Sequence, residues 1–141
     1  MRGRSNRRIY TWREFRRDLD RIERLFRSHF DLSELILFSV AFGGVPLGVS
    51  LKNRLGVPLY IIDPKRLDHF PLQLYSSLSF PVLLDDISDT GRTLKKVCEA
   101  PVFKNFNIYP FTLTLFCKPT TTFVPNVFLH STRFWVVFPW E

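Results

Sequence analysis

Apolar residues recur every three or four positions between residues 12 and 28. These positions are Trp12, Phe15, Leu19, Ile22 and Phe26. The spacing predicts an amphipathic helix whose apolar stripe packs against the rest of the chain. Thr11 and Glu14 have the spacing of a capping box, so we expect the helix to begin directly after Thr11.

Five short apolar runs follow this segment, and each has the length of a buried strand. They cover residues 35–40, 57–63, 80–86, 108–118 and 134–140. Helix-like sequence lies between some of them: VSLKNRL ends at Gly56, and TLKKVCEA is stopped by Pro101. The alternation predicts an α/β fold with a mainly parallel sheet flanked by helices.

Three unusual segments each come directly after a strand candidate. They are FGGVPLG (residues 42–48), DDISDTGRT (residues 85–93) and CKPTTT (residues 117–122). Ligands of parallel sheets bind outside the carboxyl ends of the strands. We therefore expect the three segments to converge on one edge of the sheet.

The length of 141 residues and the hydrophobic content of 45% fit one globular domain. The longest stretch without a charge, residues 35–51, contains three glycines and a proline, unlike a membrane-spanning helix. The basic start MRGRSNRR is followed by no apolar signal-peptide segment. These features predict a cytoplasmic protein that does not associate with membranes.

Residues 1–30 hold ten arginines against four acids, whereas the rest of the chain is nearly neutral. Asp20 with Arg24 and Glu23 with Arg27 have the spacing of helical ion pairs. We expect a basic, flexible arm over residues 1–8 and a domain over residues 9–141. Two interpretations of the charge stay open: a solvated helix with a frayed arm, or a surface that binds nucleic acid or an acidic partner.

Cys98 and Cys117 fit no metal-binding or redox spacing, and three scattered histidines offer no zinc cluster. Both cysteines are therefore expected to be structural. A disulfide between them is the alternative if the source is a hyperthermophile.

The segment VLLDDISDTGRTL (residues 82–94) carries the strongest chemical signal. Asp85 and Asp86 repel each other at the end of a buried strand unless cations or hydroxyl donors face them, and a ribose diol with Mg²⁺ would satisfy both. Thr90 to Thr93 lead into a helix, so their N–H groups and hydroxyls can surround a phosphate. Gly91 permits a close approach there, and Asp89 faces the middle of the site.

Two other kinds of ligand-binding loop do not fit this segment. The acidic residues lack the spacing of a calcium-binding EF-hand loop, and the segment lacks the Gly-Lys-Ser/Thr ending of a Walker A loop. A plain acidic turn with a helix cap remains compatible with the residues alone.

The order of two acids, two variable residues and Asp-Thr-Gly-x-Thr after an apolar run resembles the phosphoribosyl pyrophosphate (PRPP) signature of the type I phosphoribosyltransferases. Further segments occur in the same order as in the xanthine-guanine group of these purine enzymes. They are YTWREF, ILFSVAFGGVPLGVSLKNRLGVPLY, FCKP and FWVVFPWE, and with the signature they cover most of residues 10–141. The resemblance implies a single-domain type I phosphoribosyltransferase-like fold with a shortened hood.

For the PRPP side of the site, the resemblance implies that Asp85 and Asp86 hold the ribose hydroxyls and Mg²⁺. Asp89 would be the catalytic residue near N7 of the purine and would also belong to the phosphate-binding loop. The other members of that loop would be Thr90, Gly91, Arg92 and Thr93. Pyrophosphate would bind the loop of Phe42, Gly43 and Gly44, which in relatives often contains a non-proline cis peptide.

For the base, the resemblance implies that Lys118 approaches the C6 oxygen, Trp135 stacks on the ring and the main chain near Val136 contacts its edge. Two positions depart from the family pattern. Phe42 replaces a charged residue, and the hood segment, residues 64–79, is short; Lys65, Arg66 and the pair Tyr75-Ser76 are its polar candidates.

The resulting hypothesis is a Mg²⁺-dependent purine phosphoribosyltransferase of purine salvage. It would join guanine, xanthine or hypoxanthine to PRPP, release pyrophosphate and act as a homo-oligomer. The alternative is a non-catalytic relative that senses nucleotides or binds nucleic acid through its arginine-rich N-terminus.

Overall fold

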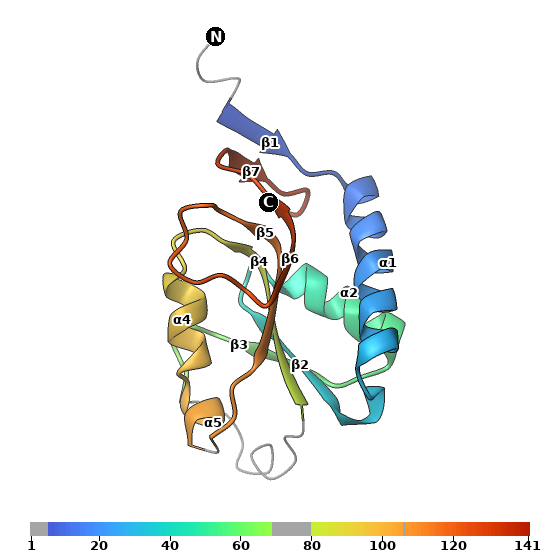
Figure 1. The fold of residues 1–141 in the computed structure, drawn as a ribbon, viewed down its shortest axis with the longest axis vertical. Helices are drawn as coiled ribbons and strands as arrows, with labels where there is room; N and C mark the ends of the chain where they lie inside the picture. The colour runs from blue at the N-terminus through green and yellow to red at the C-terminus, as the bar shows by residue number, and fades with distance from the viewer. Residues whose placement is uncertain (1–5, 69–79, 106) are drawn as a thin grey trace.

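The computed structural model describes residues 6–68, 80–105 and 107–141. Figure 1 shows the order of the elements along the chain. They are β1 (Arg7–Ile9), α1 (Trp12–His29), the 3-10 helix η2 (Leu32–Glu34), β2 (Leu35–Val40), α2 (Val45–Leu55), β3 (Leu59–Ile62), β4 (Phe80–Ser88), α4 (Arg92–Cys98), α5 (Pro101–Lys104), β5 (Phe111–Cys117), β6 (Val127–Ser131) and β7 (Trp135–Val137).

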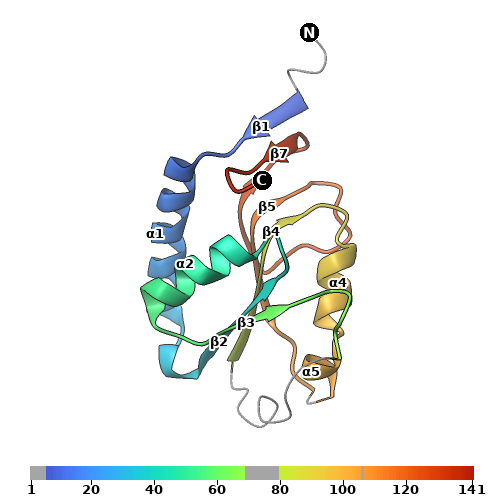
Figure 2. The ribbon, with the colours of Figure 1, turned by 180° about the vertical axis from the view of Figure 1, so that it is seen from behind.

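Five strands form one sheet in the order β3-β2-β4-β5-β6, and every neighbouring pair is parallel. Helices α1 and α2 lie on one side of this sheet, and α4 and α5 lie on the other (Figures 1 and 2). The predicted α/β fold with a mainly parallel sheet flanked by helices is confirmed.

Alternate residues of the strands supply two separate cores, as the two-residue period of a strand requires. In β2, Leu35 and Leu37 pack with α1 and α2, whereas Ile36 and Phe38 pack with α4 and α5. All six residues of β2 are therefore buried. This explains why five of its six residues are apolar and the pattern does not alternate, with Ser39 as the one polar residue.

Helix α1 forms where the apolar periodicity predicts it, and the Thr11 hydroxyl accepts the N–H of Glu14 at 3.1 Å. Four of the five stripe residues are buried, but Trp12 stays 54% exposed. Of the two predicted ion pairs, Arg27 with Glu23 is present at 2.9 Å. Asp20 instead pairs with Arg54 of α2 at 2.6 Å, which joins the two helices.

Several predicted boundaries differ from the structure. Helix α2 begins at Val45 and not near residue 49, because Pro46 fits the first turn of a helix. Strand β4 continues two residues beyond Asp86 to Ser88. Pro101 does more than follow α4, since it also opens the short helix α5.

Two strands were not predicted. Strand β6 extends the sheet beyond β5, and β1 pairs with β7 in a separate two-stranded parallel sheet. Arg7 and Arg8, expected in the arm, are part of β1. Residues 1–5 lie outside the described residues, so the flexible arm stays a prediction for them.

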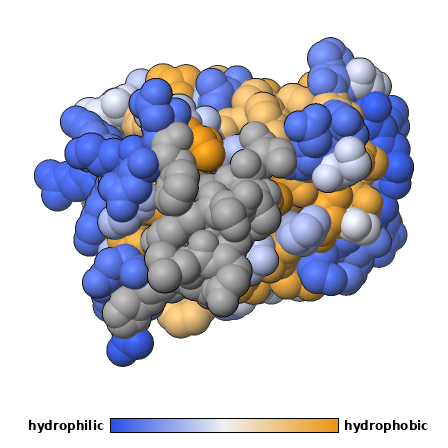
Figure 3. Space-filling model, turned by 90° about the horizontal axis from the view of Figure 1, so that it is seen from below, coloured by the Kyte–Doolittle hydropathy of each residue, from blue (hydrophilic) through white to orange (hydrophobic). Residues whose placement is uncertain are grey.

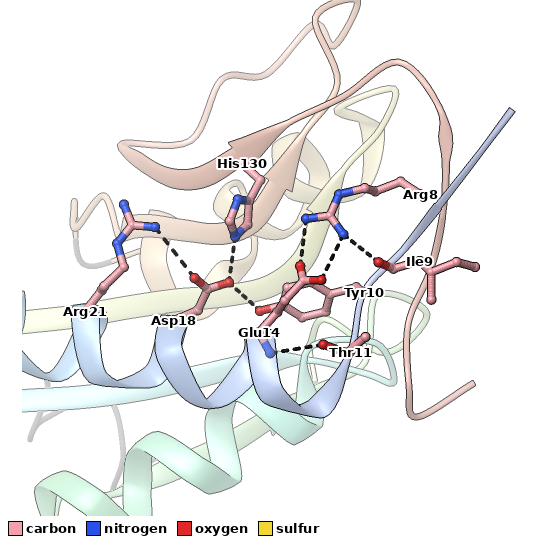
Figure 4. A network of polar contacts seen from close by, with 8 residues as sticks. All are labelled: Arg8, Ile9, Tyr10, Thr11, Glu14, Asp18, Arg21 and His130. Atoms are coloured by element: carbon pink, nitrogen blue, oxygen red, sulfur yellow. Dashed lines mark hydrogen bonds and ion pairs between the residues drawn. The ribbon is translucent and has the colours of Figure 1, made fainter. Parts of the chain in front are cut away.

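A buried polar group links α1 to the rest of the chain (Figure 4). Asp18, only 3% exposed, accepts the hydroxyl of Tyr10 at 2.5 Å and lies 2.7 Å from Nε2 of His130 in β6. Arg21 adds an ion pair at 3.6 Å. Burial and the bond to Asp18 raise the pKa of Tyr10, so its hydroxyl remains a donor.

The amino ends of the strands are closed by aromatic rings. Phe30 lies 4.8 Å from Phe80 and 5.2 Å from Phe111, measured between ring centroids. The view from below shows hydrophobic surface between two hydrophilic flanks (Figure 3).

Among the described helices, none combines the length and the apolar content needed to cross a bilayer.

Cys98 and Cys117 are both buried and free, so they form no disulfide with each other. Burial raises the pKa of the Cys98 thiol to about 11, as expected for a structural cysteine.

Candidate functional site

The three unusual segments converge at the carboxyl ends of adjacent strands, as predicted. Residues 41–44 follow β2, residues 89–91 follow β4, and residue 118 follows β5. The strands are parallel and neighbouring in the order β2-β4-β5, so these segments meet at one edge of the sheet. A cavity of about 370 Å³ opens there.

One continuous segment, residues 85–91, supplies most of the cavity wall, together with Thr93 and Leu94. Val40, Ala41, Gly43 and Pro64 also line the cavity. Both predicted ribose residues, four of the five predicted phosphate residues and Gly43 of the pyrophosphate loop therefore share one cavity, whereas Arg92, Phe42 and Gly44 do not line it.

Asp85 and Asp86 are held in an electrostatically costly position. Asp85 is 7% exposed, and its Oδ1 accepts the N–H of Asp86 at 2.8 Å. Burial and the neighbouring charge of Asp86 raise the pKa of Asp85 well above its usual range. Burial also raises the pKa of Asp86, with a contribution from the charge of Glu141. A cation or hydroxyl donors in the cavity would relieve this cost.

The glycine pair after β2 lies directly against these acids. A Cβ on Gly43 would overlap the carboxylate of Asp86, and one on Gly44 would lie 2.6 Å from the carbonyl oxygen of Leu84. Backbone atoms therefore exclude a Cβ at Gly44, and a Cβ at Gly43 would displace the Asp86 carboxylate. The peptide between Ala41 and Phe42 is cis, as the resemblance implies, and the Phe42 side chain is 88% exposed.

The turn at the end of β4 presents polar groups to the cavity. Asp89, Thr90, Arg92 and Thr93 are exposed, whereas Gly91 is buried with a φ of 90°. The Arg92 N–H reaches the Thr90 hydroxyl at 3.3 Å. Within the described residues, the N–H groups of Gly91 and Thr93 donate to no protein acceptor. The turn is thus open to an anion.

The residues predicted to bind the purine lie beside this cavity but do not line it. The Lys118 N–H donates to the carbonyl of Ser88 at 2.9 Å, which joins it to the end of β4. Its ammonium group donates to the carbonyl of Phe134 at 2.7 Å. Trp135 follows directly in β7 and is 63% exposed, whereas Val136 is buried. Lys118 therefore bonds to the residue that directly precedes Trp135 in the chain.

Sequence reasoning gave no role to Glu141, which shares a second cavity of about 460 Å³ with Asp86. This cavity is also lined by Gly43 and Phe42, so it adjoins the first one. An acid at the end of the apolar segment FWVVFPW is the only signal that could have drawn attention to it. Sequence reasoning also gave no role to Ser88, Thr121 and Thr122, whose hydrogen bonds join the end of β4 to the loop after β5.

The structure describes only some of the polar residues that were expected to contribute from the hood segment. Lys65 and Arg66 are exposed after β3 and do not line the cavity. Tyr75 and Ser76 lie outside the described residues, as does most of the hood segment, so the shortened hood stays a prediction.

Comparisons with known proteins place this geometry in context. No family model and no curated protein matches the chain. Solved structures do match it. A purine phosphoribosyltransferase from Pyrococcus horikoshii Ot3 is 29% identical, with a TM-score of 0.79 over 96% of this chain and 94% of that one.

Two further structures share the fold at lower identity. A xanthine-guanine-hypoxanthine phosphoribosyltransferase from Helicobacter pylori is 20% identical, with a TM-score of 0.79 over 96% of this chain and 92% of that one. A hypothetical protein from Neisseria gonorrhoeae with bound ppGpp is 16% identical, with a TM-score of 0.68 over 96% of this chain and 89% of that one. The predicted resemblance is confirmed at the level of the fold.

Proposed function

We propose that this chain, which has the type I phosphoribosyltransferase fold, transfers the phosphoribosyl group of PRPP to a 6-oxopurine and releases pyrophosphate. The observation that supports the proposal is the single cavity shared by Asp85, Asp86, Gly43 and the open turn at Thr90 and Gly91. This combination provides acceptors for a sugar diol, close backbone approach and N–H donors for phosphate in one place.

Each side chain then has a definite task. Asp85 and Asp86 accept hydrogen bonds from the ribose hydroxyls, while the N–H groups of Gly91 and Thr93 and the hydroxyls of the same turn hold the 5′-phosphate. Gly43 and Gly44 let pyrophosphate approach the backbone closely. Asp89, exposed at the cavity wall, exchanges a proton with N7 of the purine.

The purine itself would contact the neighbouring strand ends. Lys118 donates to the C6 oxygen, which selects 6-oxopurines over adenine. Trp135 stacks on the ring, an interaction worth about 1–3 kcal/mol per base, and the backbone near Val136 contacts the base edge. Lys118 now bonds to the Phe134 carbonyl, so it would exchange or share that acceptor when the base binds.

The residues present fit a bound Mg²⁺. The buried Asp85 and the partly buried Asp86, both with raised pKa values, supply hard oxygen ligands, and their repulsion is what a divalent cation offsets. Asp85 and Asp86 would hold Mg²⁺, which when bound neutralises charge on the departing pyrophosphate. We extend the proposal to a cytoplasmic homo-oligomer of purine salvage, whose assembly light scattering can measure.

An activity assay tests the enzyme directly. The protein is incubated with PRPP, Mg²⁺ and guanine, xanthine, hypoxanthine or adenine, and nucleotide formation is measured. We expect turnover with at least one 6-oxopurine, none with adenine, and none for the double variant Asp85→Asn with Asp86→Asn. A folded protein without turnover on any of these bases would remove the proposed activity.

A second candidate function, nucleic-acid binding, rests on the exposed face of α1. Within the described residues, four arginines of this helix make no ion pair, because Asp20 and Glu23 are already paired with Arg54 and Arg27. The four are Arg13, Arg16, Arg17 and Arg24. Such a row of cations can neutralise phosphates and release their counterions.

Binding of a single-stranded RNA at several salt concentrations tests this candidate. If the helix contributes, replacing the four arginines by alanine lowers the dependence on salt, by about 0.7 in the log–log slope for each phosphate that is no longer neutralised. Deletion of residues 1–5, which leaves strand β1 intact, separates the contribution of the arm. Unchanged binding in both variants would exclude the basic N-terminus as the nucleic-acid surface.

A further inference from the structure

The loop from β5 to β6, residues 118–126, folds over the turn that ends β4, and we refer to it as the threonine loop. Thr122 donates two hydrogen bonds to the carbonyl oxygen of Thr90, from its N–H at 2.9 Å and its hydroxyl at 2.7 Å. The buried hydroxyl of Ser88 donates to the carbonyl of Phe123 at 2.7 Å and lies 2.9 Å from the Thr121 hydroxyl. The loop is therefore fixed both to the end of β4 and to the turn that follows it.

The two bonds from Thr122 determine how one peptide plane is oriented. In a trans peptide, the C=O and N–H groups point in opposite directions. Since the carbonyl of Thr90 is directed to Thr122, the N–H of Gly91 is directed away from the threonine loop. Thr90 and Gly91 both line the cavity of about 370 Å³, and within the described residues this N–H has no protein acceptor.

Close packing supports the same orientation. A Cβ on Gly91 would lie 2.5 Å from the Phe123 nitrogen and 2.8 Å from the Thr121 hydroxyl, so the turn and the loop touch without space between them. Rotating the Thr90–Gly91 peptide would break both bonds from Thr122. It would also direct a carbonyl oxygen toward the place where an anion would bind, which is repulsive.

We infer that Thr122 is a positioning residue for phosphate binding: it holds the Thr90–Gly91 peptide with its N–H available to the ligand, without touching the ligand itself. The inference rests on the proposed function, because the anion concerned is the 5′-phosphate of PRPP. Ser88 and Thr121 assist by fixing the loop that carries Thr122.

Three variants of the full chain test the inference. Thr122→Val keeps the shape of the side chain but loses its hydroxyl, and Thr122→Ser restores the hydroxyl. Thr120→Val is the matched control, because Thr120 is exposed in the same loop and makes no hydrogen bond with the described residues. Calorimetric titration with ribose 5-phosphate and the KM for PRPP are the two measurements, and urea unfolding checks that each variant folds.

For Thr122→Val, loss of one hydrogen bond predicts that the Kd for ribose 5-phosphate and the KM for PRPP rise about threefold to tenfold. We expect kcat and the KM for the purine to stay near the wild-type values, because the base and the reacting carbon are bound by other residues. Thr122→Ser and Thr120→Val should bind as the wild type does.

The outcomes separate the two proposals. If the wild type binds ribose 5-phosphate and Thr122→Val binds it equally well, the positioning role is wrong and the proposed function stands. The positioning role is equally wrong if the variant loses only unfolding stability. If the wild type binds neither ribose 5-phosphate nor PRPP, both the proposed function and the positioning role of Thr122 are wrong.

Discussion

At the scale of single residues, Asp85 combines a requirement of the site with a cost to the fold. Its carboxyl group is 7% exposed at the end of β4, next to Asp86. A group whose pKa is raised by folding favours the folded state below its unfolded pKa and loses that contribution as the pH rises. Because the pKa of Asp85 is raised, the protein without ligand should lose stability between acidic and neutral pH.

Asp85→Asn tests this cost in the absence of ligand. The amide oxygen can still accept the Asp86 N–H, but no charge is buried. We expect the variant to be more stable than the wild type at pH 8, by about 1 kcal/mol or more since each pKa unit corresponds to about 1.4 kcal/mol. Near pH 4 the difference should vanish. Urea denaturation at both pH values measures it.

Asp89→Asn is the control for this experiment, because it removes the same charge at an exposed position on the same turn. Its free energy of unfolding should differ little from the wild type at either pH. A lower stability of Asp85→Asn at pH 8 would mean that the carboxylate is stabilised by contacts stronger than the burial and the neighbouring charge.

Local sequence predicted the residues of the site only where they are adjacent in the chain. Asp85 to Thr93 form one continuous signature, so their chemistry and spacing could be interpreted together. Thr122 and Glu141 reach the same region from distant segments: Thr122 bonds to Thr90, and Glu141 lines a cavity together with Asp86. No local pattern marks such contacts, which depend on how strands β5 and β7 are arranged.

At the scale of elements, the turn between β4 and α4 depends on a glycine for two separate reasons. Gly91 has a φ of 90°, and its Cα faces Phe123 and Thr121 at distances that exclude a Cβ. Gly56, at the end of α2, also has a positive φ, 67°, but nothing lies within 4 Å of its Cβ position. Substitution of Gly56 therefore tests backbone strain alone, whereas substitution of Gly91 tests strain together with steric crowding.

We expect Gly56→Ala to lower the free energy of unfolding by about 1 kcal/mol, the usual cost of a positive φ for alanine. Gly91→Ala should cost roughly 2–4 kcal/mol, because the methyl group also displaces the threonine loop. It should in addition weaken ribose 5-phosphate binding, whereas Gly56→Ala should not. Equal costs in urea unfolding would show that the loop moves aside easily.

A helix or strand could be predicted when its own residues carry a clear hydrophobic pattern, and was missed when it depends on pairing with a distant segment. The amphipathic periodicity of α1 and the mostly apolar run of β2 are strong local signals, and both elements were found at nearly the predicted positions. Strand β6 is partly exposed along its length and has no uninterrupted apolar run, so it was missed. Strand β1 has three residues, two of them arginines, and exists only because β7 pairs with it.

At the scale of the whole molecule, the two ends of the described chain support one another. Strand β1 pairs with β7 so that Arg7 lies opposite Trp135 and Arg8 opposite Val136. Trp135 and Val136, proposed to bind the purine, are thus held by the N-terminal strand, whereas Lys118 follows β5 of the main sheet that carries the PRPP cavity. Binding of the purine would therefore depend on β1 and β7, whereas binding of PRPP would not.

Arg8 anchors this arrangement (Figure 4). Its guanidinium donates to both carboxylate oxygens of Glu14, at 2.7 and 3.3 Å, which ties β1 to α1. It also lies 5.3 Å from the ring centroid of Phe116, in β5. Arg7 is the natural control, because its side chain is exposed and makes no ion pair or hydrogen bond with the described residues.

Arg8→Ala should therefore loosen β1 and β7 together. We expect a loss of about 1 kcal/mol in the free energy of unfolding, as for a well-formed, partly buried ion pair, and a higher KM for the purine. The KM for PRPP should stay unchanged, because Asp85, Asp86 and the phosphate turn belong to β4 and its end. Arg7→Ala should alter none of these quantities. Equal increases in both KM values, or equal effects of the two variants, would show that β1 does not act specifically on the base through β7.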